Sequence, residues 1–220
     1  MFGSSLPFVG FGGSRSLPSV ASPGGLVASV VSSVVRSGRG VAVGCASGAD
    51  AAVLSFRLSL PFPPSSGPQL AVFAVGGPGL GGRGSGFWRG SAWPVVQQAA
   101  VLAQSSSSSV VVRWWAGGGA PVPLRQRLRA RSVALVQAVA ASGPQAGFVF
   151  FVAGGWPASR GSWGSVLSAL RLGSSVVVFP VGCSVSCFPR SFSGVGPVRW
   201  VPAAQSGAWS SGFRAVGAAR

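Results

Sequence analysis

Seven residue types are missing from this chain of 220 residues: Lys, Glu, Asn, Thr, Ile, His and Tyr. Each of them requires a codon with adenine at the first or second position, so the gene is depleted in adenine. The same depletion leaves one acidic residue, Asp50, against 17 arginines, and a net charge of +16. Part of this charge is therefore a product of base composition, and solvated arginines scattered over loops are its simplest interpretation. The charge still attracts polyanions such as nucleic acids.

The missing residue types also exclude most catalytic chemistry. With no histidine and one carboxylate, the chain has no acid–base pair of the usual kinds and no Ser-His-Asp triad. Three cysteines, Cys45, Cys183 and Cys187, suit a reducing compartment, and without histidine or a second cysteine pair they lack the ligands of a metal site. Cys45 is interpreted as a small buried residue, with a thiol of lowered pKa as the alternative. We predict no catalytic residue, no metal and no cofactor.

Long apolar runs are missing too. No run approaches the ~20 residues of a membrane span, and the longest, residues 146–153, has the length of a strand. No basic segment precedes the first apolar residues, so no signal peptide is predicted. We expect a cytoplasmic protein that does not contact a membrane. Apolar residues make up 48% of the chain, enough to form a buried core.

Short β-branched or aromatic runs alternate with segments of helical length. This regular order argues against a reading frame that encodes no folded protein. Strands are predicted at residues 7–11, 41–43, 70–75, 110–115, 146–152 and 175–179, and helices at 26–36, 49–58, 94–104, 124–141 and 162–172. Loops are predicted at 61–68, 76–86, 105–109, 117–123 and 154–160.

Continuous apolar strands separated by helices indicate an α/β, Rossmann-like fold with a mostly parallel sheet and helices on both faces. Residues 1–180 are expected to form this domain. Residues 181–220 are rich in Gly, Ser, Pro and Trp. They are expected to be a partly disordered extension with an edge strand at 199–201.

The stretch VAVGCASGADAAV (residues 41–53) is the centre of the functional prediction. It passes from a strand through a Gly-rich turn into a helix start that holds Asp50. Backbone amides at such a helix start form a site for phosphate or another anion. Asp50 is expected to accept hydrogen bonds from a ribose hydroxyl, a base or Arg15. A helix cap is the alternative.

Ligands of parallel sheets bind beyond the carboxyl ends of the strands. The turns at residues 13–15, 44–50, 76–83 and 154–165 all follow predicted strands, so we expect them to converge on one edge. In the first turn Arg15 is suited to phosphate, which a guanidinium binds through two hydrogen bonds. A turn with a solvated arginine is the alternative.

Three further features fit such an edge. Arg129 and Arg131 are two positions apart, so they do not share a helix face. One is expected to reach the ligand and the other solvent. The GSWGS segment (residues 161–165) offers hydroxyls and amides at a helix start, with the amides around Gly164 expected to hold phosphate. Trp156 and Trp163 are the tryptophans expected near the site, where they would stack on bases, and the other tryptophans are assigned to the core or its rim.

The motifs GGSRS (residues 12–16), GCASGAD (44–50), LRARS (128–132) and GSWGS (161–165) occur in an order that resembles the SLOG superfamily, and within it the DNA-processing protein A family. Members of that family load recombinase on single-stranded DNA. They carry a G-S-R turn, an S-G-x-A-x-G-x-D turn, an R-x-R-N segment and an S-G-x-x-T-A-type turn. The resemblance covers about residues 8–180. Ser132 stands where the family has Asn, and Ser165 where it has Thr, both residue types that this chain lacks.

The turns and the resemblance together predict these ligand-binding residues: Gly13, Ser14, Arg15, Gly44, Ala46, Gly48, Asp50, Arg129, Arg131, Ser162, Gly164 and Ser165. The resemblance implies non-catalytic binding of single-stranded DNA or a nucleotide-derived ligand, in DNA processing or recombination. The alternative is a nucleotide sensor or a degenerate relative of the superfamily's phosphoribohydrolases. Those enzymes carry P-G-G-x-G-T-x-x-E, whereas residues 154–166 lack the Glu. The sequence leaves open whether the protein forms a homo-oligomer.

Overall fold

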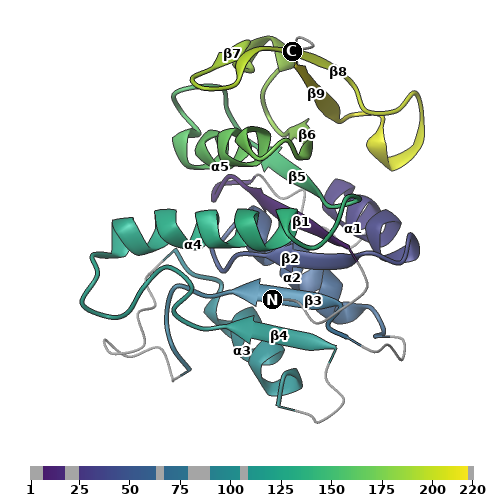
Figure 1. Ribbon diagram of the computed structural model, residues 1–220. Coiled ribbons are helices and arrows are strands. Elements are labelled where there is room, and N and C mark those ends of the chain that lie inside the picture. The colour runs from purple at the N-terminus through teal and green to yellow at the C-terminus, as the bar shows by residue number, and fades with distance from the viewer. Residues whose placement is uncertain (1–6, 18–24, 63–66, 79–89, 105–108, 218–220) are drawn as a thin grey trace.

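The computed structural model describes residues 7–17, 25–62, 67–78, 90–104 and 109–217. Within them the chain is an α/β protein with five α-helices and one nine-stranded sheet, in which parallel and antiparallel strands are mixed (Figure 1). Parts of the predicted loops (residues 63–66, 79–86 with Arg83, and 105–108), Trp88 and the last three residues of the tail lie outside the described residues.

Six parallel strands make up most of the sheet, and all six strands predicted from sequence are among them. They are β1 (Phe8–Gly13), β2 (Gly40–Val43), β3 (Leu70–Phe73), β4 (Val110–Arg113), β5 (Gly147–Val152) and β6 (Ser175–Pro180). The sheet order is β4-β3-β2-β1-β5-β6-β9-β8-β7, so β1 lies between β2 and β5. The prediction ended β1 too early, because Gly12 and Gly13 pair with Phe150 and Phe151 of β5.

Five helices connect these strands, and each was predicted within about two residues at its ends. They are α1 (Leu26–Arg36), α2 (Ala49–Ser59), α3 (Trp93–Leu102), α4 (Leu124–Ala140) and α5 (Arg160–Arg171). The valine-rich α1 forms despite poor propensity because Val27, Val30, Val31 and Val34 make one buried stripe at helical spacing. Burial of that stripe outweighs the few tenths of a kcal/mol per residue that valine costs.

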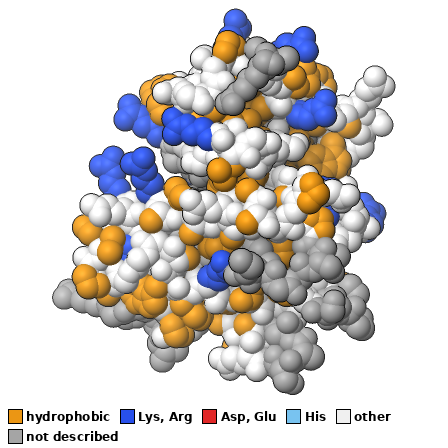
Figure 2. All heavy atoms as spheres, viewed as in Figure 1, with side chains coloured by type: hydrophobic (Ala, Val, Ile, Leu, Met, Phe, Trp, Pro, Cys, Tyr) orange, Lys and Arg blue, Asp and Glu red, His pale blue; other side chains and the backbone are white. Residues whose placement is uncertain are grey.

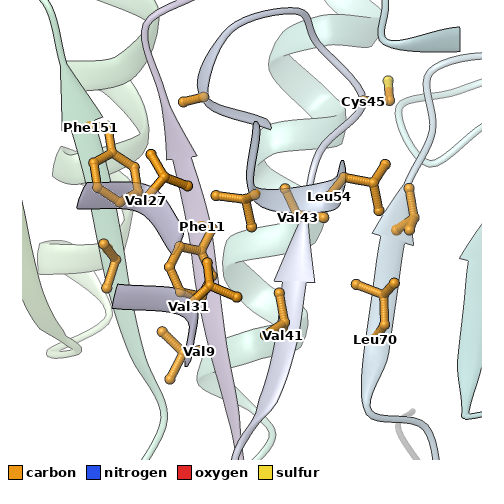
Figure 3. Packing of buried hydrophobic residues seen from close by; sticks show 14 of the residues in the cluster. Val9, Phe11, Val27, Val31, Val41, Val43, Cys45, Leu54, Leu70 and Phe151 are labelled. Atoms are coloured by element: carbon orange, nitrogen blue, oxygen red, sulfur yellow. The ribbon is translucent and has the colours of Figure 1, made fainter. Parts of the chain in front are cut away.

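Alternate residues of the strands contribute to two separate clusters of buried side chains, as the two-residue period of a strand requires. Val9 and Phe11 of β1 belong to one cluster, together with residues of α1, α2 and α3 (Figure 3). Phe8 belongs to the other, together with Leu135 of α4 and Val166 of α5. β2, β3 and β5 are buried along their whole length, which explains their uninterrupted apolar sequences.

The C-terminal residues differ from the expectation of a partly disordered extension. Residues up to 217 contain β7 (Ser191–Phe192), β8 (Gly196–Pro202) and β9 (Phe213–Gly217), and the predicted strand at 199–201 lies in β8. β9 pairs antiparallel with β6, so the sheet continues past the boundary expected at residue 180. Aromatic contacts attach this part: the Trp163 ring lies 5.0 Å from Phe188 and 5.9 Å from Trp200.

Candidate functional site

A cleft of about 920 Å³ lies at the carboxyl ends of β1 and β5 and is lined also by residues of α4 and α5. The chain moves from β1 to β2 on one side, and β5 enters on the other side of β1. The order of strands therefore reverses between β1 and β5, and such a switch point is where open α/β sheets bind ligands.

Most of the predicted ligand-binding residues line this cleft. They are Gly13, Ser14, Arg15, Ala46, Asp50, Arg129, Arg131, Ser162, Gly164 and Ser165. Gly44 and Gly48 do not line it, and neither do the described residues of the turn after β3, residues 76–78. Three of the four expected turns, after β1, β2 and β5, therefore meet at one place.

Asp50 lies at the inner end of the cleft, and its partner is Arg131. Its Oδ2 atom accepts a hydrogen bond from Nη1 of Arg131 at 3.1 Å and another from the backbone N–H of Ala46 at 3.1 Å. The Asp50 and Arg131 side chains are 7% and 8% exposed. Arg15, one of the partners expected for Asp50, makes no contact with it. Arg131 was predicted to bind the ligand, but its pairing with Asp50, 81 residues away in the sequence, was not predicted.

The charge of Asp50 keeps the Arg131 guanidinium protonated despite its burial. Desolvation alone lowers the pKa of Arg131, but the negative charge and hydrogen bond of Asp50 outweigh it, so the pKa of Arg131 is raised. Nη1 is bonded to Asp50, whereas the buried Nε has no hydrogen-bond partner among the described residues. Arg131 therefore lines the cleft while its Nη1 is held by Asp50.

Cys45, between β2 and α2, is fully buried in the core. Desolvation raises the pKa of its thiol, although the nearby positive charge of Arg131 opposes this. The alternative of a thiol with lowered pKa is wrong, and Cys45 is a small buried residue (Figure 3).

Gly44 and Gly48 shape the cleft without facing it. A Cβ atom at Gly44 would meet Nη1 of Arg131 and Oδ2 of Asp50, so only glycine leaves room for the ion pair. Gly48 has φ +79°, which favours glycine, and a Cβ atom there would meet the carbonyl oxygens of Ser14 and Arg15. Both glycines allow close packing of the turns.

Ser14 joins the turns that form the cleft. Its backbone N–H donates to Phe151 O at 2.8 Å, and its carbonyl oxygen accepts from the N–H of Ala49 at 3.1 Å. Its hydroxyl accepts from the N–H of Ala153 at 2.9 Å and is hydrogen-bonded to the Ser159 hydroxyl at 3.2 Å. Ser14 is 7% exposed, and its hydrogen bonds within the protein show that it has a structural role, whether or not it also contacts a ligand. The backbone N–H of Ala49, the first residue of α2, is therefore already hydrogen-bonded to Ser14.

The start of α5 corrects one prediction. The helix begins at Arg160, so Gly164 is its fifth residue and the amides near the helix start that lack an intrahelical acceptor belong to residues 160–162. The Ser165 hydroxyl donates to Gly161 O at 3.3 Å. Gly161 and Gly164 are exposed and line the cleft, and a Cβ atom at either would meet nothing within 4 Å.

Five exposed arginines surround the cleft: Arg15, Arg125, Arg129, Arg160 and Arg171. On the face seen in Figure 2 arginines gather over the ends of α4 and α5. Arg129 is exposed and Arg131 buried, as expected for residues on different helix faces, but both line the cleft, whereas only one was expected to reach the ligand. Sequence reasoning missed Arg125, Arg160 and Arg171. The spacing of Arg125 and Arg129, four residues apart on one helix, was a usable signal for the first of them.

The two tryptophans expected near the site lie in different surroundings. Trp163 is fully buried and donates through Nε1 to Gly154 O at 3.1 Å, so it is a core residue. Trp156 is 59% exposed and precedes Pro157, which lines the cleft. The described residues contain no cluster of three or more potential metal ligands, and none of the described helices is long and apolar enough to span a membrane.

Comparison with known proteins found no matching protein-family model, no matching curated protein and no matching solved structure.

Proposed function

We propose that this chain is a Rossmann-like domain, with helices on both faces of its sheet, that binds single-stranded DNA or a nucleotide-derived ligand without catalysis. The resemblance of its motifs to the DNA-processing protein A family supports a part in DNA processing or recombination. The observation that carries the proposal is the cleft at the strand switch point, surrounded by five exposed arginines. Arg15 and Arg129, which both line the cleft, contact phosphates.

The charge balance of the cleft supports an anionic ligand. Asp50 is the only acidic side chain of the chain, and its charge is compensated by Arg131. The exposed arginines therefore have no carboxylate side chain to pair with, and an anion entering the cleft meets uncompensated positive charge. The start of α5, which has no side-chain cap, adds backbone amides and the positive end of the helix dipole.

The glycines of α5 support close approach of the ligand. Glycine inside a helix costs about 1 kcal/mol relative to alanine, yet nothing in the described residues packs into the space beside Gly161 or Gly164. Packing does not explain these glycines, whereas a ligand lying against the α5 backbone does.

Binding to an oligonucleotide at two salt concentrations tests the proposal and separates its two ligand classes. For a strand, each phosphate neutralised by an arginine releases counterions, so affinity falls steeply with salt. For a free nucleotide, the ligand raises the melting temperature by mass action with weak salt dependence. Arg129→Ala should reduce the slope of log K against log salt by about 1. Absence of binding of both ligands at low salt would contradict the proposal.

Gly164→Ala separates binding from stability. The substitution should raise the free energy of unfolding by about 0.5–1 kcal/mol through helix propensity, and it should weaken ligand binding because a methyl group enters the cleft. Urea denaturation and the same binding titration measure the two effects. Gly173→Ala is unsuitable as a control, since that residue has φ +69°. Ser29→Ala, at an exposed position of α1 that does not line the cleft, serves instead. Unchanged binding by Gly164→Ala would count against a ligand on the α5 backbone.

A further inference from the structure

Trp156 is the only aromatic side chain that is mostly in solvent among the described residues. It is 59% exposed, whereas the other exposed large apolar side chains are aliphatic. Exposure of an indole ring on this scale is unfavourable, because its burial is worth several times that of a small apolar side chain. Because residues 157–160, which follow Trp156 directly, line the cleft, a ligand that extends past the cleft is the natural cover for the ring.

The loop that carries Trp156 is fixed at both ends. Gly154 O accepts from Nε1 of the buried Trp163 at 3.1 Å. A Cβ atom at Gly155 would meet the carbonyl oxygen of Cys187, so the C-terminal part of the chain packs directly on the loop. The N–H of Ser159 donates to Gly155 O at 3.2 Å, and the Ser159 hydroxyl is hydrogen-bonded to Ser14. The ring is therefore presented by a fastened loop, which lowers the entropy lost on binding.

The neighbours of Trp156 place it just outside the cleft. Pro157, Ala158, Ser159 and Arg160 all line the cleft, but Trp156 does not. A flat ring next to an arginine-lined channel is the combination that holds single strands: arginines follow the phosphates, and an aromatic ring stacks on an unpaired base.

We infer that Trp156 stacks on an unpaired base of a nucleic-acid strand whose phosphates lie in the arginine-lined cleft. The inference rests on the proposed function and narrows it to a strand that continues beyond the cleft, because a mononucleotide held inside it would leave the ring uncovered.

Four forms of the full chain test this: wild type, Trp156→Ala, Trp156→Phe and Val101→Ala. Val101 is 68% exposed on α3, which contacts β4 and α2 rather than the cleft, so it controls for loss of a surface apolar side chain. Fluorescence anisotropy measures binding of labelled oligothymidylate and oligouridylate of about 12 nucleotides. Thermal shift measures binding of thymidine monophosphate, and circular dichroism checks the fold.

Trp156→Ala should weaken oligonucleotide binding about 5- to 150-fold, the usual range for loss of one stacked base. Its salt dependence and its thymidine monophosphate binding should be unchanged. Trp156→Phe should retain most of the affinity, and Val101→Ala all of it. If the substitution weakens binding of both oligonucleotides equally, the ring stacks on DNA and RNA alike. If it weakens binding of only one, the ligand is the nucleic acid of that type.

Two results would overturn the inference while leaving the proposed function standing. One is wild-type affinity of Trp156→Ala for both oligonucleotides. The other is an equal loss of oligonucleotide and mononucleotide binding, which would place the ring in a nucleotide pocket. If the wild type binds none of the three probes at low salt, the proposed function fails, and the inference fails with it.

Discussion

Three arginines are buried among the described residues, and two of them, Arg131 and Arg57, lie near opposite edges of the sheet and differ in one respect. Arg131, at the carboxyl edge, is bonded to the carboxylate of Asp50. Arg57, near the amino end of β3, is 1% exposed and has no carboxylate partner. Its Nη2 donates to the Gln69 side chain at 3.1 Å, and its guanidinium lies 3.8 Å from the centre of the Phe62 ring.

The difference shows in the pKa of the two groups. Desolvation lowers the pKa of Arg57 to about 10, whereas Asp50 raises the pKa of Arg131. The chain has one carboxylate side chain, and it is placed beside the cleft rather than beside Arg57. A buried arginine is therefore tolerated without a counter-charge, and the position of Asp50 points to a requirement of the cleft itself.

The largest expected effect is that of Asp50→Ala. It leaves Arg131 charged, buried and without its partner, and removal of one member of a buried ion pair costs about 3–5 kcal/mol. The backbone N–H of Ala46 loses its acceptor as well. Urea denaturation followed by tryptophan fluorescence measures the loss of unfolding free energy.

The double substitution Asp50→Ala with Arg131→Met is the control for this prediction. Removing both charges should recover most of the loss, because apolar residues often replace a buried ion pair at little cost. If Asp50→Ala costs no more than substitution of Arg57, the carboxylate is not needed to keep Arg131 buried, and the contrast between the two sites disappears.

The elements of the sheet were predictable because their signals are local. The uninterrupted apolar sequence of β5 and the stripe of valines on α1 each follow from one stretch of chain. The pairing of Gly12 and Gly13 with β5 was not predictable in this way, because it depends on a strand about 140 residues later in the sequence. The C-terminal strands were missed for the same reason: Phe188 and Trp200 are anchored by Trp163, in another part of the sequence.

The candidate site shows the same limit. Placing turns after parallel strands was enough to bring Ser14, Asp50 and Ser162 to one cleft. The pairing of Asp50 with Arg131 could not be read from sequence, because many arginines were equally available to the single carboxylate. Trp163 was misjudged since a helix start next to a Gly-rich loop does not reveal which side chain turns into the core.

Gly44→Ala is expected to have the next largest effect. Its methyl group would meet both Nη1 of Arg131 and Oδ2 of Asp50, so the ion pair must separate or shift. Overpacking of this kind costs about 1–3 kcal/mol. The measurement is again urea denaturation, and Gly38→Ala is not a matched control because of its φ of +74°. Gly161→Ala, at a glycine of α5 with open space around it, is the better control and should not lower the unfolding free energy, because alanine favours the helix more than glycine does. An equal loss in both variants would contradict a specific role for the space at Gly44.

The smallest expected effect is that of Arg57→Met. The methionine side chain replaces the apolar stem and removes a desolvated charge that has no carboxylate partner, so the unfolding free energy should change by less than about 1 kcal/mol.

The lowered pKa of Arg57 fixes the sign of the pH dependence of stability. Above pH of about 10 the native state releases the Arg57 proton while the unfolded chain still binds it, so wild-type stability should rise with pH relative to Arg57→Met. Urea denaturation of both forms between neutral pH and pH about 11 measures this difference, in which the titration of the cysteines cancels. A difference that falls or stays level above pH 10 would mean that Gln69 and Phe62 hold the Arg57 charge as well as Asp50 holds that of Arg131.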